Sequence, residues 1–318
     1  MNYNFFQKKL HNLCLGSKSI KKSLFEIEKL IFHNSIKIKN EKHIFITSLP
    51  RSGTSALLEF IYSSNEFGSL LYKDMPFVLS PNLFSKFSSK KNIIKKERMH
   101  KDGMFYNLNT PEAFDEVFFL TFENELDWEN NFLKYIELIL IKNKKQKYLS
   151  KNNYNFKRLH KIKKIFPESK FLVPFREPLE HAYSMMTQNL NFKKQQNDDK
   201  FVLKYTNYLG HLEFGNNHKP WFKPDAYKDT SSINYWLEQW FLYFKELLSL
   251  KTNLDNCYLI NIDKFCNNQN YQIDLLKKLN ISEKTSFTLN YKKKIVEENF
   301  DKILFEKCKK LYIDLENN

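Results

Sequence analysis

Three short apolar segments alternate along the chain with longer segments whose apolar residues recur at helical spacing. The apolar segments span residues 43–47, 171–175 and 257–262. A short apolar run bounded by polar turns predicts a buried strand, and strands that alternate with helices predict a parallel sheet. We therefore expect an α/β fold in which helices cover both faces of a parallel sheet.

Helical spacing also extends to both ends of the chain. Residues 1–40 are expected to form an amphipathic lead-in, with Leu24, Ile27, Leu30 and Ile31 at helical spacing. The lysine-rich tail, residues 267–318, is expected to be a second helical addition. Further helices are predicted at residues 54–64, 90–100, 111–143, 154–166, 178–191 and 233–250.

Two other features complete this organisation. Thr110 and Pro111 suit an N-cap and the first helical position, so they are predicted to start the helix 111–143. Residues 193–230 have the composition of a long polar insertion. All these parts are assigned to one domain that spans the 318 residues.

Composition and charge narrow the classes of function. The chain is 42% hydrophobic, which is enough for a packed core, and its formal net charge is +15. The lysine runs lie in helical or loop contexts without a nucleic-acid-binding motif, so we expect solvated surfaces that attract anions and no nucleic-acid partner. A basic polyanion-binding protein is kept as an alternative. The lysine runs are residues 142–147, 157–164 and 292–294.

The cysteines and the N-terminus indicate the compartment. Cys14, Cys257, Cys266 and Cys308 are scattered without the spacing of a zinc site, so we expect reduced, mostly buried thiols and no metal. The N-terminus lacks the apolar core of a signal peptide, and no apolar run approaches the ~20 residues of a membrane span. A soluble, cytoplasmic protein is expected.

The segment Ile44 to Phe60, IFITSLPRSGTSALLEF, joins a predicted strand to a predicted helix through a tight turn. A Walker A loop would need lysine directly after Gly53, but Thr54 stands there. The helix amides, the Thr54 and Ser55 hydroxyls and the Arg51 guanidinium still suit a phosphate or sulfate group. The alternative is a plain turn with a surface arginine.

A second strand, basic turn and helix follow in the segment 171–184. Arg176 ends the strand, Pro178 starts the helix, and Ser184 lies eight residues after Arg176. Because ligands of parallel sheets bind at the carboxyl ends of the strands, two such turns predict two phosphate sites in one region. A ligand with phosphates at its 5' and 3' positions fits this arrangement.

These two motifs resemble those of the sulfotransferases that use 3'-phosphoadenosine-5'-phosphosulfate (PAPS). The family's 5'-phosphosulfate loop, P-[KR]-S-G-T-[ST], corresponds to Pro50-Arg-Ser-Gly-Thr-Ser55, and its 3'-phosphate element corresponds to Arg176, Pro178 and Ser184. The likeness covers residues 43–265. The segment 149–155, with the predicted helix to Phe166 and Pro167, resembles the stretch that precedes the 3'-phosphate element in bacterial members. The likeness to the family implies a P-loop-like fold and transfer of a sulfuryl group from PAPS to an acceptor hydroxyl, without a metal.

The resemblance also implies roles for individual residues. Arg51 would bind the 5'-phosphate and stabilise the leaving group, and the residues from Ser52 through Gly53 and Thr54 to Ser55 would hold the phosphosulfate. Arg176 and Ser184 would hold the 3'-phosphate. The transfer would be an in-line displacement at sulfur that depends on positioning and charge stabilisation.

This chain lacks the histidine that many cytosolic members use as the general base. Their Lys-Thr-His segment is Lys151-Asn152-Asn153 here, and their glycine-rich Arg-Lys-Gly element is missing. Protein-tyrosine sulfotransferases use a carboxylate shortly after the first helix, where this chain has Asp74, which is therefore our first choice. Lys73 and Lys151 could assist the leaving group. The alternative bases are His100, Asp102, Glu112, Asp115 and Glu116.

Several further residues have competing interpretations. His181 fits an orienting or structural role at least as well as a catalytic one. An aromatic set could offer an adenine or acceptor surface, although helical spacing favours core packing for its last four members. The set is Trp221, Tyr235, Trp236, Trp240 and Phe241.

The sequence gives little information about the identity of the acceptor or the oligomeric state. We expect a carbohydrate or small-metabolite acceptor whose pocket is shaped by residues 193–230, and the pattern gives no oligomeric state. A P-loop kinase or other phosphotransferase is the main alternative, but it should need a lysine after Gly53 and a magnesium ligand.

Overall fold

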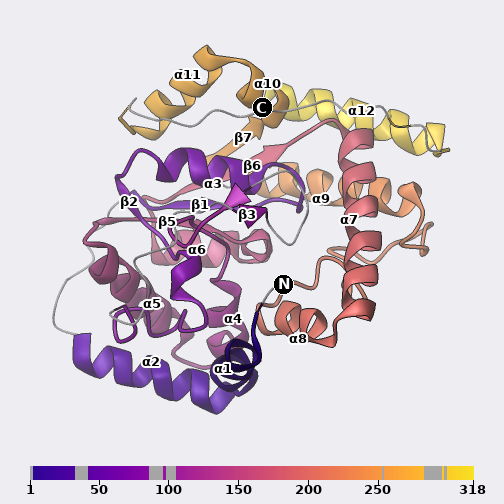
Figure 1. Ribbon diagram of the computed structural model, residues 1–318. Helices are drawn as coiled ribbons and strands as arrows, with labels where there is room; N and C mark the ends of the chain where they lie inside the picture. Colours follow the sequence, from indigo (N-terminus) through magenta and orange to yellow (C-terminus); the bar gives the residue numbers. More distant parts are fainter. Residues whose placement is uncertain are drawn as a thin grey trace.

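A computed structural model describes residues 3–32, 42–85, 96–97, 105–252, 254–282, 296 and 299–318. Its central feature is a parallel sheet with the strand order β2-β5-β1-β6-β7 (Figure 1). The strands are β1 (Ile44–Ile46), β2 (Phe67–Gly68), β5 (Lys147–Lys151), β6 (Lys170–Phe175) and β7 (Cys257–Asn261). This arrangement confirms the predicted α/β fold, and it adds β2 and β5 to the three strands that the sequence predicted.

Successive residues of β1 point to opposite faces of the sheet and enter different cores. Ile44 and Ile46 join one apolar cluster, while Phe45 joins the other. The first cluster lies under the helices α3 (Thr54–Tyr62), α10 (Ile262–Asn267) and α11 (Gln269–Leu279). Helices therefore cover both faces, as Figure 1 shows. The helices that contribute to the second cluster include α4 (Glu116–Phe122), α5 (Trp128–Asn143), α6 (Leu159–Ile165) and α9 (Ile233–Lys251).

The N-terminal lead-in consists of α1 (Phe5–Gly16) and α2 (Lys18–Phe32). The helices were predicted, but the buried face was not, because Ile27, Leu30 and Ile31 are exposed. The opposite side of α2 packs inward instead, and it carries Phe25 and Glu28. The Glu28 carboxylate accepts hydrogen bonds from the backbone of residues 82 and 83, which orients the helix.

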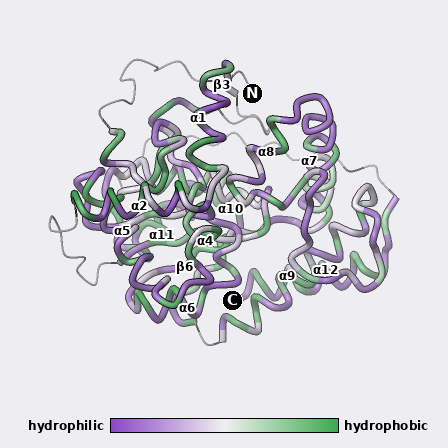
Figure 2. The backbone as a smooth tube through the Cα atoms, turned by 90° about the horizontal axis from the view of Figure 1, so that it is seen from below, coloured by the Kyte–Doolittle hydropathy of each residue, from purple (hydrophilic) through white to green (hydrophobic). Residues whose placement is uncertain are grey.

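The region 193–230 was predicted to be a long polar insertion, but it contains helices and buried aromatic side chains. α7 (Pro178–Asp198) runs past its predicted end, and α8 (Lys200–Tyr208) follows. Phe201, Phe214 and Trp221 are buried in the core. In Figure 2 hydrophilic and hydrophobic positions alternate along the helices, as expected of helices that bury one side.

Two predicted helical segments differ in the structure. Pro111 forms an isolated antiparallel bridge with Leu71, and α4 begins only at Glu116. The residues between them are therefore not helical. The prediction for 90–100 lies mostly outside the described residues, and the part that is described, β3 (Lys96–Glu97), pairs as a strand with β4 (Phe105–Tyr106).

The remaining helices lie around the sheet and its covering helices. The short 3₁₀ helices η1 (Tyr72–Asp74) and η2 (Asn153–Arg158) follow β2 and β5, and α12 (Lys302–Asn317) packs on α9 and α7. Within the described part of the chain, no helix has the length and apolar character needed to cross a membrane. All four cysteines are free thiols and three of them are buried, as predicted.

Candidate active site

The loop between β1 and α3 has an unusual backbone. Gly53 is the residue before α3 and has φ +92°, and Arg51 has φ +73° although it carries a side chain. A Cβ atom at Gly53 would lie 2.4 Å from Ile262 Cγ1, so only glycine fits. The loop therefore follows a path that brings its backbone close to the start of α10.

The neighbouring elements η2 and β6 hold the base of the loop. The Thr47 hydroxyl donates to the Asn153 carbonyl at 2.9 Å, and the Ser48 hydroxyl donates to the Pro174 carbonyl at 2.6 Å. The Ser52 hydroxyl is buried, and among the described residues it has no hydrogen-bond partner. A buried polar group of this kind next to the first amides of a helix suits an anionic ligand.

The second predicted element contacts this loop directly. Arg176 follows the last residue of β6, and its Nη1 donates to the Arg51 carbonyl at 3.3 Å. In the other direction, Arg51 Nε donates to Ser184 Oγ on α7 at 3.3 Å. The structure thus brings Arg51, Arg176 and Ser184 together at the carboxyl ends of β1 and β6.

Two side chains on the first turn of α7 support this contact. Glu180 accepts a hydrogen bond from Arg176 Nη2 at 3.1 Å, and both side chains are buried. His181 is fully buried, and Nε2 lies 2.9 Å from the Pro50 carbonyl oxygen. Burial, with the nearby Arg176 charge, lowers the pKa of His181 to about 3, so its ring is neutral near pH 7.

Asp74 lies at the end of η1 in a buried ion pair. Its Oδ2 accepts the backbone N–H of Leu71 at 2.8 Å and also pairs with Lys142 near the end of α5. Burial lowers the pKa of Lys142, while Asp74 opposes that shift. The Asp74 carboxylate is thus engaged with a structural partner.

Glu112 lies in the extended segment that follows the Pro111 bridge. One carboxylate oxygen is 3.6 Å from Lys151 Nζ, and the other accepts the Tyr72 hydroxyl at 2.6 Å. Lys151 ends β5 and is paired in register with Ile46, the last residue of β1 before the loop that leads to α3. Glu112 and Lys151 therefore lie at the edge of the sheet where the loop begins.

The other predicted bases have different surroundings. Asp115 accepts hydrogen bonds from the hydroxyls of Tyr135, Tyr148 and Ser150, and burial raises its pKa. Glu116 is bound by both Nη atoms of Arg158 at 2.8 and 3.0 Å. These contacts are typical of groups that fix the fold. His100 and Asp102 lie outside the described residues.

Lys73 and the aromatic set do not form part of the loop. Lys73 Nζ donates to the Asn109 side chain at an exposed position. Tyr235, Trp236 and Trp240 are fully buried, which confirms their predicted packing, and Phe241 is half-buried. Trp221 is also buried, and it stacks on Tyr154 with ring centroids 5.8 Å apart.

Two of these contacts, Arg176 with Glu180 and Tyr72 with Glu112, were not predicted from the sequence. Glu180 follows Arg176 by four residues, a helical spacing that favours ion pairs and could have indicated the contact. Tyr72 contacts Glu112 across 40 residues of sequence, and no local pattern predicts that pairing.

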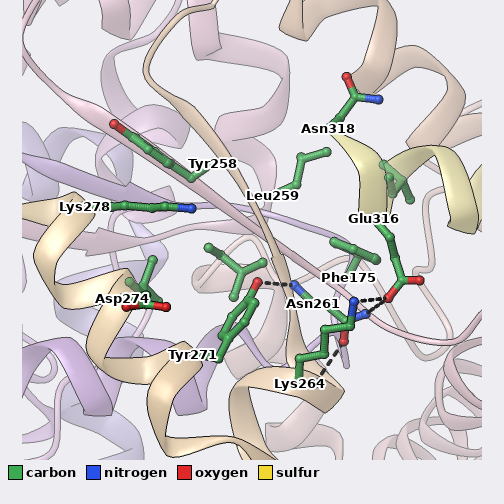
Figure 3. Close-up of a pocket in the computed structure, with 13 residues that line it drawn as sticks. Phe175, Tyr258, Leu259, Asn261, Lys264, Tyr271, Asp274, Lys278, Glu316 and Asn318 are labelled. Carbon is green, nitrogen blue, oxygen red and sulfur yellow. Dashed lines mark hydrogen bonds and ion pairs between the residues drawn. The ribbon is translucent and has the colours of Figure 1, made fainter.

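A separate pocket of about 270 Å³ lies along the outer edge of β7, between α11 and α12 (Figure 3). Asn261 and Lys264 contact Glu316 there, and Phe175 forms part of the wall. None of the predicted site residues lines this pocket. Among the residues that the structure describes, no cluster of side chains could hold a metal ion.

Comparison with solved structures shows proteins with a similar fold. The structure is similar to sulfotransferase STF1 from Mycobacterium tuberculosis H37Rv, with 11% identity, a TM-score of 0.53 and coverage of 88% of this chain and 78% of that chain. It is also similar to sulfotransferase STF9 from Mycobacterium avium, with 9% identity, a TM-score of 0.54 and coverage of 98% and 78%. At these identities the likeness shows the fold alone.

Sequence comparison gives the family. No curated protein sequence matches the chain. A model of the sulfotransferase family, however, matches residues 43–255 and so spans more than half of the chain, including both arginine turns. The chain therefore belongs to the sulfotransferase family.

Proposed function

We propose that the protein transfers the sulfuryl group of PAPS to a hydroxyl group of a carbohydrate or small metabolite. The observation that carries this proposal is the direct contact between the two arginine turns, in which Arg51 bonds to Ser184 and Arg176 bonds to the Arg51 carbonyl. One ligand with phosphate groups at both its 5' and 3' positions would satisfy both turns.

The donor would be held mainly by charge and by the backbone. Arg51, the amides from Ser52 to Ser55 and the Thr54 and Ser55 hydroxyls bind the phosphosulfate. Arg176 and Ser184 bind the 3'-phosphate, and this contact distinguishes PAPS from ATP. The buried Ser52 hydroxyl supports the assignment, because a ligand oxygen would give it a hydrogen-bond partner.

The proposed reaction is a displacement at sulfur. The acceptor oxygen forms a bond to sulfur while the bond from sulfur to the oxygen of the 5'-phosphate breaks, and the acceptor proton moves to a carboxylate. Adenosine 3',5'-bisphosphate leaves with the additional negative charge. Arg51 and Lys151 stabilise that charge, so most of the catalysis is electrostatic.

Two carboxylates compete for the role of the general base. Asp74 was the first choice from the sequence and stays a prediction, but its Oδ2 is engaged by buried Lys142 and by the Leu71 N–H. Glu112 contacts Lys151 beside the start of the phosphate loop, and Tyr72 fixes its orientation. We therefore favour Glu112 as the base and assign Asp74 to the support of η1.

The acceptor would approach from the side of α8. Tyr205 on α8 is buried, and its raised pKa has burial as the main cause, with smaller contributions from Tyr3, Tyr72 and Glu112. His211, just after α8, lies 3.2 Å from the Ala113 carbonyl. The region 193–230 is therefore next to the favoured base, which supports the role in acceptor binding that we propose for it.

Thermal unfolding with a ligand panel tests the donor. We expect adenosine 3',5'-bisphosphate to raise the Tm more than ADP, ATP with magnesium or a short DNA duplex at equal concentration. An Arg176→Lys variant should lose most of this preference, because lysine cannot form the same two-pronged contact. Stabilisation by ATP with magnesium but not by the bisphosphate would favour a phosphotransferase. Stabilisation by DNA but not by the bisphosphate would favour a polyanion-binding protein.

A further inference from the structure

Three side chains from one short segment of the chain contact Pro50 and Arg51. Arg176 donates to the Arg51 carbonyl, Ser184 accepts from Arg51 Nε, and His181 contacts the carbonyl of the preceding residue, Pro50. All three side chains belong to the 3'-phosphate element or to the helix that it starts. The loop and this element are thus linked at the main chain as well as by side chains.

The protonation of His181 follows from its partner. A carbonyl oxygen can only accept a hydrogen bond, so the proton of the neutral ring must lie on Nε2, which faces Pro50 at 2.9 Å. His181 Nδ1 is then an unprotonated atom, and it is buried without a hydrogen-bond partner among the described residues. His181 is therefore a fixed donor to the loop.

This donor acts on the conformation of Arg51. Because a peptide group is planar, fixing the Pro50 carbonyl also fixes the orientation of the Arg51 N–H and limits φ of Arg51. The bond from Arg176 fixes the next peptide and limits ψ in the same way. Arg51 has φ +73°, a region that residues with side chains rarely adopt.

We propose that His181 is a positioning residue that, together with Arg176, holds Arg51 in the left-handed conformation on which donor binding depends. His181 need not touch the donor to act in this way. It transmits the position of α7, which binds the 3'-phosphate through Ser184, to the backbone of the 5'-phosphosulfate loop. This inference rests on the proposed donor site.

Two substitutions separate the hydrogen bond from simple packing. His181→Leu removes the donor and keeps an apolar side chain, whereas the amide nitrogen of His181→Gln can reach the Pro50 carbonyl much as Nε2 does. We expect His181→Leu to weaken binding of adenosine 3',5'-bisphosphate about tenfold, as loss of a buried hydrogen bond would. We expect His181→Gln to stay within about threefold of the wild type.

Two controls separate this role from loss of stability. Phe192→Leu alters a buried residue of the same helix, 11 positions further on, and should lower the Tm without changing affinity. If His181→Leu does not fold, His181→Asn replaces it, because its shorter amide cannot reach Pro50. Hydrogen exchange of the loop amides at residues 51–56 gives a readout without ligand and should be faster in His181→Leu than in His181→Gln.

The outcomes distinguish the two proposals. Equal affinity and equal loop exchange in the Leu and Gln variants would overturn the role of His181. A wild-type protein that does not bind the bisphosphate would overturn the proposed donor, and the exchange measurement would still test His181. Faster exchange with weaker binding in the Leu variant, both restored by Gln, supports the inference.

Discussion

Arg51 and Gly53 place two left-handed backbone conformations within three residues, with φ values of +73° and +92°. For arginine this conformation costs on the order of 1–3 kcal/mol, and such strain persists only where surrounding contacts fix it. His181 and Arg176 supply those contacts. The loop thus has a charged residue where backbone geometry alone would favour glycine.

Gly53→Ala should disrupt the loop directly. The new Cβ would lie 2.4 Å from Ile262 Cγ1 at a φ that alanine does not favour. We expect a loss of about 1–3 kcal/mol in the free energy of unfolding and loss of bisphosphate binding, measured by urea unfolding and calorimetry. Gly16→Ala is the matched control, because its Cβ would meet Tyr208 only at 3.4 Å and should leave binding unchanged.

The choice between Glu112 and Asp74 is a second test on single residues. Glu112→Gln should keep bisphosphate affinity within about threefold and lower transfer at least about 100-fold, as expected for a general base. Asp74→Asn should leave Lys142 buried without its countercharge and cost about 3 kcal/mol of stability, with transfer by the folded protein retained.

Transfer in these variants can be followed without a known acceptor. The measurement is incorporation of labelled sulfate from PAPS into acceptors of a cell extract, corrected for the folded fraction of each variant. Normal transfer by Glu112→Gln together with abolished transfer by Asp74→Asn would instead identify Asp74 as the base.

At the level of whole elements, α2 shows how a polar residue can decide which face of a helix is buried. The Glu28 carboxylate accepts three hydrogen bonds, from the backbone of Asn82 at 2.6 Å, from its side chain at 2.7 Å and from the backbone of Leu83 at 2.9 Å. Burial raises the pKa of Glu28, and these bonds oppose that shift. The helix therefore turns a charged residue inward and leaves Leu30 exposed.

Substitutions on the two sides of α2 should differ accordingly. Glu28→Ala leaves three donors without their acceptor, so we expect the free energy of unfolding to fall by about 2–3 kcal/mol. Leu30→Ser on the exposed side should change it by less than about 0.5 kcal/mol. Urea unfolding of both variants measures the difference. A larger loss for Leu30→Ser would mean that the apolar side of α2 is the buried one.

The sequence predicted those elements whose own composition determines them. β1 and β6 are buried along their whole length, and most of β7 is apolar, so a local pattern was sufficient. β2 has only two residues, and β5 begins and ends with lysine, so their pairing depends on neighbouring strands. For that reason, a strand that is very short or has polar ends cannot be predicted from its own sequence pattern.

The candidate site was predictable to a similar degree. The arginine turns follow from motifs, and the structure brings their residues together. The contacts of Glu112 could not be predicted, because the sequence Thr110-Pro111-Glu112 is typical of a helix start. In the structure Pro111 instead pairs with Leu71 in an antiparallel bridge. Pairing across 40 residues is a tertiary effect that overrides the local signal.

At the scale of the whole molecule, two histidines are buried in neutral form, His43 directly before β1 and His181 on α7. His43 Nδ1 accepts the Tyr148 N–H at 3.0 Å, and burial lowers the pKa of His43 to about 4. Burial and Arg176 lower the pKa of His181 to about 3. Both folded values lie below the ordinary pKa of about 6.5.

These shifts predict lower stability in mild acid. Above pH 6.5 both histidines are neutral in the folded and unfolded chain and contribute nothing to the pH dependence. As the pH falls below 6.5, the unfolded chain binds protons that the folded chain excludes, so each histidine lowers the free energy of unfolding by up to about 1.4 kcal/mol per pH unit. The loss should continue until the pH approaches the folded pKa values of about 4 and about 3.

Urea unfolding of the wild type and His181→Gln at pH 7.5 and pH 5.5 isolates one of these contributions. Carboxylates with raised pKa values, such as Asp115, act in the opposite direction, but they are common to both proteins and cancel in the comparison. We expect the wild type to lose about 1.4 kcal/mol more than His181→Gln between the two pH values, because glutamine does not titrate. Equal losses would mean that His181 binds a proton in the folded protein, and Nε2 could then no longer be assigned as the sole protonated atom facing Pro50.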